Sequence, residues 1–171
     1  MEPVLETPRL VLRKLDHGDV GAMFAILSDP VTMRFWPAPF DRAAAERWVR
    51  RSIDSYASRG FGRYAVIEKK SGALLGDCGF LRLEVDGEEE NDLGYILAHR
   101  FWGNGFATEA AGACLVYGFE SLGFQRVVAS MEEKHLASRR VAEKIGFRLE
   151  RSFRNARNRN LPTILLSRER R

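Results

Sequence analysis

The segment from Phe101 to Ala110, FWGNGFATEA, constrains the fold of this chain more than any other. Two glycines, Gly103 and Gly105, lie between a strand-like segment and a run of small, helix-forming residues. The start of a helix leaves about four backbone N–H groups without partners and carries partial positive charge. Glycines keep such amides accessible, so the segment predicts either a cradle for an anion, phosphate above all, or a plain tight turn.

The residues around the glycines favour the anion cradle. The segment is not a P-loop, because the Lys-Ser/Thr pair is missing. It is not a dinucleotide-binding fingerprint either, because the preceding segment, DLGYILA, ends an antiparallel run instead of opening a β-α-β unit. Thr108 adds a hydroxyl one turn into the helix. Gly94, in the middle of the preceding strand, indicates a bulge or a close approach of backbone.

Apolar periodicity and turn residues predict alternating strands and helices. Asp41 and Gly60 mark the ends of the clearest helix, in which Ala45, Trp48 and Val49 share one face. The predicted strands are residues 10–14, 64–68, 74–85, 90–97, 126–131, 147–153 and 161–167, and the predicted helices are residues 19–28, 43–60, 105–121 and 135–145. This order predicts an α+β fold with a mixed, mostly antiparallel sheet of about seven strands and about four helices. No linker interrupts it, so we expect one domain over residues 1–171.

Composition and charge argue against several classes of protein. Apolar residues make up 45% and charged residues 29% of the chain, as in globular proteins. No leader segment and no apolar run of about 18 residues is present, so we expect a cytoplasmic protein with no membrane partner. Cys78 and Cys114 lie far apart and the histidines are scattered, which predicts buried, reduced cysteines and no metal site. The net charge is +4, but the C-terminal arginines accompany no recognition motif, so we expect no nucleic-acid partner.

Three blocks of sequence resemble the GNAT superfamily of acetyl-CoA-dependent N-acetyltransferases. They are LETPRLVLRKL, DLGYILAHRFWGNGFATEA and HLASRRVAEKIGF, and they look closest to the branch of ribosomal-protein N-terminal acetyltransferases. The middle block resembles the cofactor loop Gln/Arg-x-x-Gly-x-Gly/Ala, with Trp102 in place of the polar first residue. The resemblance implies a GNAT-like fold whose sheet is splayed between the fourth and fifth predicted strands.

The resemblance also implies where acetyl-CoA, the co-substrate, would bind. The amides of the loop would hold the pyrophosphate, and the strand backbone would hold the pantetheine arm as an added strand. The implied cofactor-binding residues are Tyr95, Ile96, Leu97, Trp102, Gly103, Asn104, Gly105, Phe106, Ala107, Thr108 and His135. His135 replaces the usual asparagine, so it is either a hydrogen-bond donor to the cofactor or a plain surface histidine. Arg100, Arg139 and Arg140 are either contacts to the 3′-phosphate or solvated surface residues.

Acetyl transfer to an amine needs a base, an oxyanion donor and an acid for the thiolate. Asp92 is the candidate base, directly or through water, although the polar run before it also suits an exposed strand edge. A backbone amide near Tyr95 or Ile96 is the candidate oxyanion donor. Ser138 is the candidate acid unless it only caps its helix, and Tyr95 and Tyr117 are alternative acids.

The predicted activity is transfer of an acetyl group from acetyl-CoA to a primary amine in a ternary complex. The amine is a protein N-terminus or a small molecule, and the alternative is a degenerate module that senses acyl-CoA without turnover. Trp36 and Phe40 either wall the acceptor site or plug the edge of the core. The stretch RSFRNARNRN borders either the acceptor site or a homodimer contact, and its arginines weakly favour an anionic acceptor over a polyamine.

Overall fold

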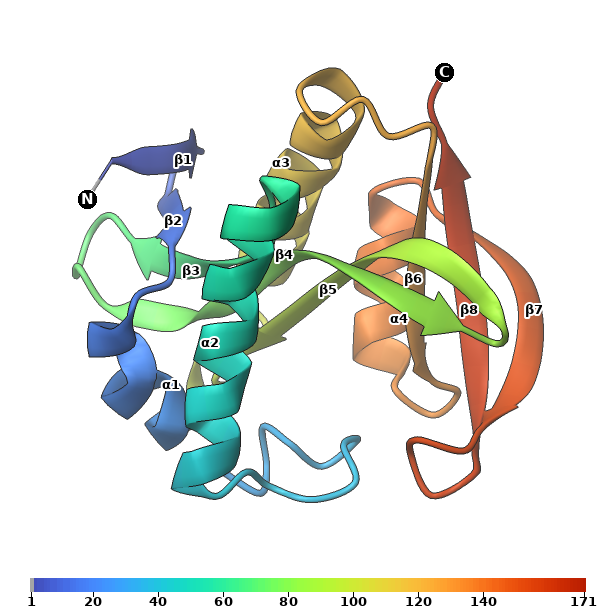
Figure 1. Ribbon diagram of the computed structural model, residues 1–171, viewed down its shortest axis with the longest axis horizontal. Helices are drawn as coiled ribbons and strands as arrows, with labels where there is room; N and C mark the ends of the chain where they lie inside the picture. Colours follow the sequence, from blue (N-terminus) through green and yellow to red (C-terminus); the bar gives the residue numbers. More distant parts are fainter. Residues whose placement is uncertain (1) are drawn as a thin grey trace.

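The computed structural model describes residues 2–171, and its strands form one sheet in the order β1-β2-β3-β4-β5-β6-β8-β7 (Figure 1). Neighbouring strands are antiparallel except β5 and β6, which are parallel. The strands are β1 (Pro3–Glu6), β2 (Leu10–Lys14), β3 (Arg63–Glu68), β4 (Leu74–Val85), β5 (Glu88–Leu97), β6 (Arg126–Glu132), β7 (Arg148–Asn155) and β8 (Leu161–Glu169). The predicted α+β class and the mixed, mostly antiparallel sheet are confirmed.

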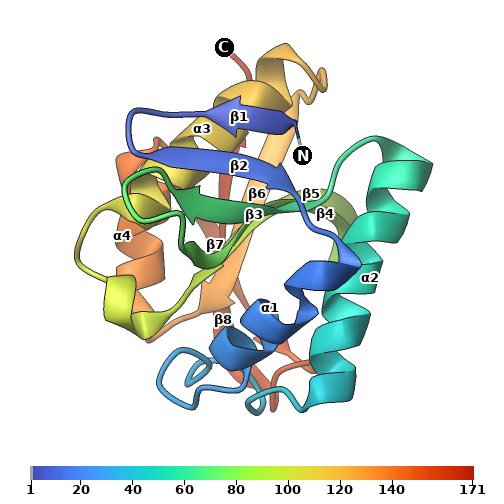
Figure 2. The same ribbon diagram turned by 90° about the vertical axis from the view of Figure 1, so that its left-hand side faces the viewer.

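Four α-helices cover the two faces of the sheet (Figure 2). They are α1 (Val20–Leu27), α2 (Arg42–Arg59), α3 (Phe106–Glu120) and α4 (Leu136–Lys144). Short 3-10 turns, His17–Asp19 and His99–Phe101, precede α1 and follow β5. None of the described helices is long and apolar enough to cross a membrane.

Alternation along β5 sends its side chains into two separate apolar cores. Leu93 and Leu97 pack in the core that contains Cys114 of α3, whereas Ile96 packs in the core that contains Trp48 of α2. This follows from the two-residue period of a strand, which also places Tyr95 with Leu93 and Asp92 on the face of Ile96. Both cysteines are free and buried, as predicted.

Local signals in the sequence set the ends of several elements. Asp41 caps α2 by accepting a 2.7 Å hydrogen bond from the Ala44 amide, and Gly60 ends the helix in the left-handed conformation at φ +80°. Asp86 and Gly87 both have positive φ and join β4 to β5 as a tight hairpin.

The sheet has one more described strand than the predicted seven. The missed strand, β1, covers only Pro3–Glu6 and pairs with β2 at the edge of the sheet. A short edge strand that begins with proline shows too little alternation to be recognised in sequence. β5 also begins at Glu88 instead of Glu90, because its first residues form the exposed, polar end of the hairpin.

Candidate active site

The sheet splits between β5 and β6. The two parallel strands pair only through Asp92 and Val128, whereas β5 pairs with β4 as far as Leu97. Beyond Asp92, one backbone edge of β5 therefore has no strand partner. The predicted splay between residues 90–97 and 126–131 is confirmed.

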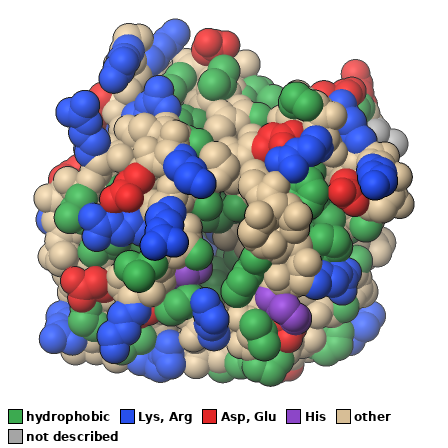
Figure 3. Space-filling view, turned by 180° about the vertical axis from the view of Figure 1, so that it is seen from behind, with side chains coloured by type: hydrophobic (Ala, Val, Ile, Leu, Met, Phe, Trp, Pro, Cys, Tyr) green, Lys and Arg blue, Asp and Glu red, His purple; other side chains and the backbone are tan. Residues whose placement is uncertain are grey.

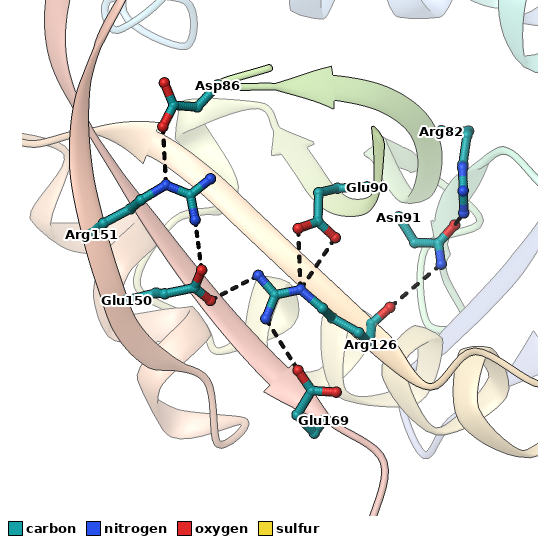
Figure 4. A network of polar contacts seen from close by, with 8 residues as sticks. All are labelled: Arg82, Asp86, Glu90, Asn91, Arg126, Glu150, Arg151 and Glu169. Carbon is teal, nitrogen blue, oxygen red and sulfur yellow. Dashed lines mark hydrogen bonds and ion pairs between the residues drawn. The ribbon is translucent and has the colours of Figure 1, made fainter. Parts of the chain in front are cut away.

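On the other side of Asp92, a charged network holds β5 and β6 together (Figure 4). The Arg126 guanidinium lies 3.1 Å from Glu90 of β5, 2.7 Å from Glu150 of β7 and 3.1 Å from Glu169 of β8. Partial burial opposes the charge of Arg126, but these carboxylates raise its pKa. The strands are thus clamped at one end and diverge at the other.

Two cavities meet at the split. Cavity A, of about 310 Å³, lies between β5, α3 and α4, and cavity B, of about 330 Å³, lies between β5, β6 and α2. Both are lined by Trp36, Tyr95, His135 and Ser138. The space-filling view from behind shows a hollow with hydrophobic side chains inside and basic side chains around it (Figure 3). These four side chains therefore lie between the two cavities, at the split.

Cavity A gathers nearly all the residues that the sequence assigned to acetyl-CoA. Its lining includes Tyr95, Ile96, Leu97, Trp102, Gly103, Gly105, Phe106, Ala107, Thr108 and His135. The exception is Asn104, which stabilises the loop from within. The side-chain amide of Asn104 donates 3.1 Å hydrogen bonds to the carbonyls of Phe101 and Trp102. The backbone carbonyl of Asn104 accepts a 2.9 Å hydrogen bond from the Arg9 guanidinium.

The glycine loop presents bare backbone to cavity A. Gly103 and Gly105 have φ of +76° and +79°, which only glycine adopts readily. Gly105 is the N-cap of α3 and offers no side-chain oxygen to the first-turn amides, and a Cβ at Gly103 would meet no atom within 4 Å. Accessible amides at the positive end of a helix fit the diphosphate of a coenzyme A thioester.

An ion pair that sequence reasoning missed braces this loop. Arg9, in the turn between β1 and β2, contacts Glu109 of α3 at 2.7 Å, and the Thr7 hydroxyl donates a 2.6 Å hydrogen bond to the same carboxylate. Burial opposes the charge of Glu109, but these hydrogen bonds lower its pKa. The only local sequence signal for this ion pair is the acidic residue in the first turn of α3, and the sequence around Arg9 does not identify Glu109 as its partner.

Tyr95 and Ser138 lie together where the cavities join. The Tyr95 hydroxyl donates a 2.8 Å hydrogen bond to the Ser138 carbonyl and lies 3.2 Å from the Ser138 hydroxyl. Burial raises the pKa of Tyr95, so its hydroxyl stays protonated. Tyr117, the other alternative acid, lines neither cavity and packs edge-on against Tyr64.

Asp92 lines cavity B but not cavity A. Asp92 is 8% exposed, and its carboxylate accepts hydrogen bonds of 3.3 Å from the amide and from the hydroxyl of Ser130. Burial raises its pKa, and the charge of Arg63 partly opposes this rise. Asp92 is therefore a buried carboxylate beside the split, on the side away from the glycine loop. Glu132, a second carboxylate on cavity B that the sequence did not suggest, lies at the end of β6.

The remaining predicted residues separate into cavity walls and core. His135 stacks on Phe35 at 4.0 Å, and burial together with Arg34 lowers its pKa to about 4, so the ring is neutral at pH 7. Trp36 lines both cavities, whereas Phe40 lines neither and packs edge-on against Trp36.

Basic residues of α4 lie at cavity A. Arg140 and Lys144 line it and could meet a phosphate group. Arg139 instead pairs with Glu143 at 2.8 Å, and Arg100 lies over the ring of Phe101. Among residues 2–171, no group of His, Cys, Asp or Glu side chains is arranged to hold a metal ion.

A buried polar triad under cavity B also escaped sequence reasoning. The Trp48 indole donates a 2.5 Å hydrogen bond to Asp77, and the Arg63 guanidinium contacts the other oxygen of Asp77 at 3.2 Å. Arg63 is 4% exposed and lies 5.4 Å above the Trp48 ring. Charged residues within otherwise apolar strands were the available signal.

Comparison with known proteins agrees with this geometry. The family model "Acetyltransferase (GNAT) domain" matches residues 9–148. The chain is 34% identical to the uncharacterized protein YkkB of Bacillus subtilis over 88% of each chain. It is 29% identical to the uncharacterized N-acetyltransferase p20 of Bacillus licheniformis over 95% of this chain and 94% of p20.

Solved structures include ribosomal-protein acetyltransferases with the same fold. One is RimL, described as a ribosomal L7/L12 alpha-N-protein acetyltransferase in complex with coenzyme A. It superposes with a TM-score of 0.79 over 98% of each chain at 18% identity, a likeness that concerns the fold. The family match, the relatives and the split sheet all agree with the predicted resemblance. This chain belongs to the GNAT family of acetyltransferases.

Proposed function

We propose that this chain transfers the acetyl group of acetyl-CoA to a primary amine, by direct attack in a ternary complex. The observation that carries the proposal is that cavities A and B meet at Tyr95 and Ser138, while the glycine loop borders only A and Asp92 borders only B. Each substrate thus has its own approach, and the two reacting groups would meet at the split. The relative p20, named as an N-acetyltransferase, supports an amine acceptor.

The residues of cavity A suit acetyl-CoA. The first-turn amides of α3 would bind its diphosphate, and the unpaired edge of β5 would hydrogen-bond the amides of the pantetheine arm. A backbone amide near Tyr95 or Ile96 on this edge would stabilise the oxyanion, a role in which one donor is worth about 2.7–4 kcal/mol. Trp102 is held against this strand by a 2.8 Å hydrogen bond from its indole to the Leu97 carbonyl.

Asp92 would accept the proton of the attacking amine, directly or through one water molecule. A raised pKa suits this task because a base works best when its pKa approaches the working pH. The bonds from Ser130 would hold the carboxylate in place during the transfer.

Ser138 would protonate the departing thiolate of coenzyme A. The Tyr95 hydroxyl accepts a hydrogen bond from the Ser138 hydroxyl, and as the alternative acid it would give the thiolate the proton that it donates here to the Ser138 carbonyl. Asp92 would thus take up the proton that the amine loses, Ser138 would supply the proton that the thiolate gains, and solvent would return a proton to Ser138 and remove the one on Asp92 after each turnover.

A thiol-release assay with acetyl-CoA tests the proposal. Peptides, amino acids, aminoglycosides and polyamines would serve as acceptors, with Asp92→Asn and Ser138→Ala beside the wild type. We expect turnover with at least one amine and a loss of about 100-fold or more in kcat for Asp92→Asn. Tight binding of acetyl-CoA without turnover of any amine would instead support the degenerate sensing module. Full activity of Asp92→Asn at neutral pH would exclude it as the base.

A further inference from the structure

Three guanidinium groups line cavity B, on the side where the acceptor would enter. They belong to Arg51 of α2, Arg63 of β3 and Arg157, in the loop between β7 and β8. The carboxylates that line the same cavity in the described chain are Asp92 and Glu132. The lining of cavity B therefore carries three guanidinium groups against two carboxylates.

Arg51 is the least compensated of the three. It takes part in no ion pair with residues 2–171. Partial desolvation lowers the pKa of Arg51, and the charges of Arg63, Arg157 and Arg59 lower it further, whereas Asp92 opposes them. A bound anion would relieve this repulsion.

Arg63 and Arg157 also retain hydrogen-bonding capacity. The buried Nε of Arg63 has no hydrogen-bond partner, although the same guanidinium contacts Asp77. Among residues 2–171, the Arg157 guanidinium contacts only the Glu84 carbonyl at 3.3 Å and the Glu84 carboxylate at 4.0 Å, and both side chains are largely exposed. Such a distant, solvated pair contributes little, so Arg157 remains available to a ligand.

The positive surface continues beyond cavity B. A neighbouring cavity of about 330 Å³, cavity C, lies between α2 and β4 and shares Arg51 and Leu81 with cavity B. It is also lined by Arg47, Arg50, Arg59 and Arg82, and Asp54 is the acidic residue of its lining. Such a surface attracts anions and repels polycations as they approach.

We propose that Arg51 and Arg157, with Arg63 behind them, select acceptor amines that also carry a carboxylate or a phosphate. The amine would lie at Asp92 and the anion on the guanidinium groups, which bind both oxyanions with charge-assisted hydrogen bonds. This inference rests on the proposed acetyl transfer and names the chemical class of its acceptor. Polyamines and aminoglycosides are excluded by the same charge.

Matched acceptors that differ only in the anion test the inference. Glycylglutamate and glycylglutamine form a peptide pair, phosphoethanolamine and ethanolamine form a phosphate pair, and spermidine represents polycations. The thiol-release assay gives kcat/KM for each, and calorimetry gives the affinity of each for the complex with coenzyme A. The two pairs separate an acidic peptide from a phosphorylated small molecule as the source of the anion.

Arg51→Gln and Arg157→Gln are the test variants, and Arg42→Gln is the control. Arg42 lies on α2, pairs with Glu46 at 3.5 Å through exposed side chains and lines none of the three cavities, so its loss removes one charge and one weak surface ion pair away from the cavities. We do not change Arg63, because its removal would leave buried Asp77 without its charge partner.

We expect wild-type kcat/KM to favour the anionic member of at least one pair by about tenfold or more. Each test variant should lower kcat/KM for the anionic member by about 10–100-fold, which corresponds to the loss of one charge-assisted hydrogen bond. The same variant should change kcat/KM for the neutral member by less than about twofold. Equal use of both members, preference for spermidine, or equal losses with both members would overturn the inference while leaving acetyl transfer intact. Absence of turnover with every amine despite acetyl-CoA binding would instead overturn the proposed function, and this inference with it.

Discussion

Replacing Gly103 with alanine separates the fold of the glycine loop from its proposed task. The residue has φ of +76°, and a Cβ there would project into open space at cavity A. Gly72, in the turn between β3 and β4, offers a matched control. It has φ of +69°, a Cβ there would also meet no atom within 4 Å, and it lines none of the three cavities.

Both changes should destabilise the protein to the same small extent. An L-residue in the left-handed region costs roughly 1–2 kcal/mol. The lower entropy of the unfolded alanine variant returns about 0.4–1 kcal/mol. The net loss of about 1 kcal/mol should lower the Tm of either variant by about 2–4 °C for a chain of this length.

Only Gly103→Ala should weaken the binding of acetyl-CoA. A methyl group in front of the loop amides would displace at least one charge-assisted hydrogen bond, worth about 1.5–3 kcal/mol, and so raise Kd by about 10–100-fold. Calorimetry gives Kd for both variants, and thermal unfolding with and without acetyl-CoA gives an independent readout. Wild-type affinity in Gly103→Ala, or an equal loss of affinity in Gly72→Ala, would refute the assignment of the loop to the diphosphate.

Further predictions concern the split itself. Burial raises the pKa of Asp92 in the folded protein, so ionisation of Asp92 lowers the stability as the pH rises above the ordinary value of 3.8. Asp92→Asn should therefore keep or raise the Tm at pH 7, although the variant loses activity. A clear loss of Tm at pH 7 would contradict the buried charge. Ser138→Ala should lower the single-turnover rate by about 100-fold or more, and by more than Tyr95→Phe does, because Ser138 is the proposed acid. A larger loss in Tyr95→Phe would assign the proton to the tyrosine instead. Arg126→Met should lower the free energy of unfolding, measured in urea, by about 1–3 kcal/mol, because it leaves the largely buried Glu90 without a partner. Arg139→Met removes one exposed ion pair and should lower the free energy of unfolding by less than about 0.5 kcal/mol.

The features that the sequence predicted correctly depend on local chemistry. The Asp41 cap and the Gly60 terminus define α2 through contacts within a few residues. The glycine loop likewise follows from the conformational freedom of Gly103 and Gly105. Such signals survive in sequence because no distant partner is needed to produce them.

The features that were missed depend on pairs distant in sequence. Arg9 reaches Glu109 across the molecule, and Trp48 reaches Asp77 from another element. The local signals, an acid in the first turn of α3 and charged residues within apolar strands, do not identify the partner, which only the folded sheet brings into contact. For Phe40 the sequence left two interpretations open, a wall of the acceptor site or a plug at the edge of the core, and in the structure its ring packs against Trp36 and Trp48.

The split also explains why several ion pairs gather at Arg126, the first residue of β6. An unpaired buried backbone group costs about 1–3 kcal/mol, so an open edge of β5 persists only where a cavity gives it water or a ligand. Pairing β5 and β6 beyond Asp92 would relieve that cost, but it would close the split at which cavities A and B lie. The contacts of Arg126 with three strands fix the register at Asp92 and Val128 without extending the pairing. The contacts of Arg126 therefore stabilise the sheet at the paired end of β5 and β6 and leave the split open.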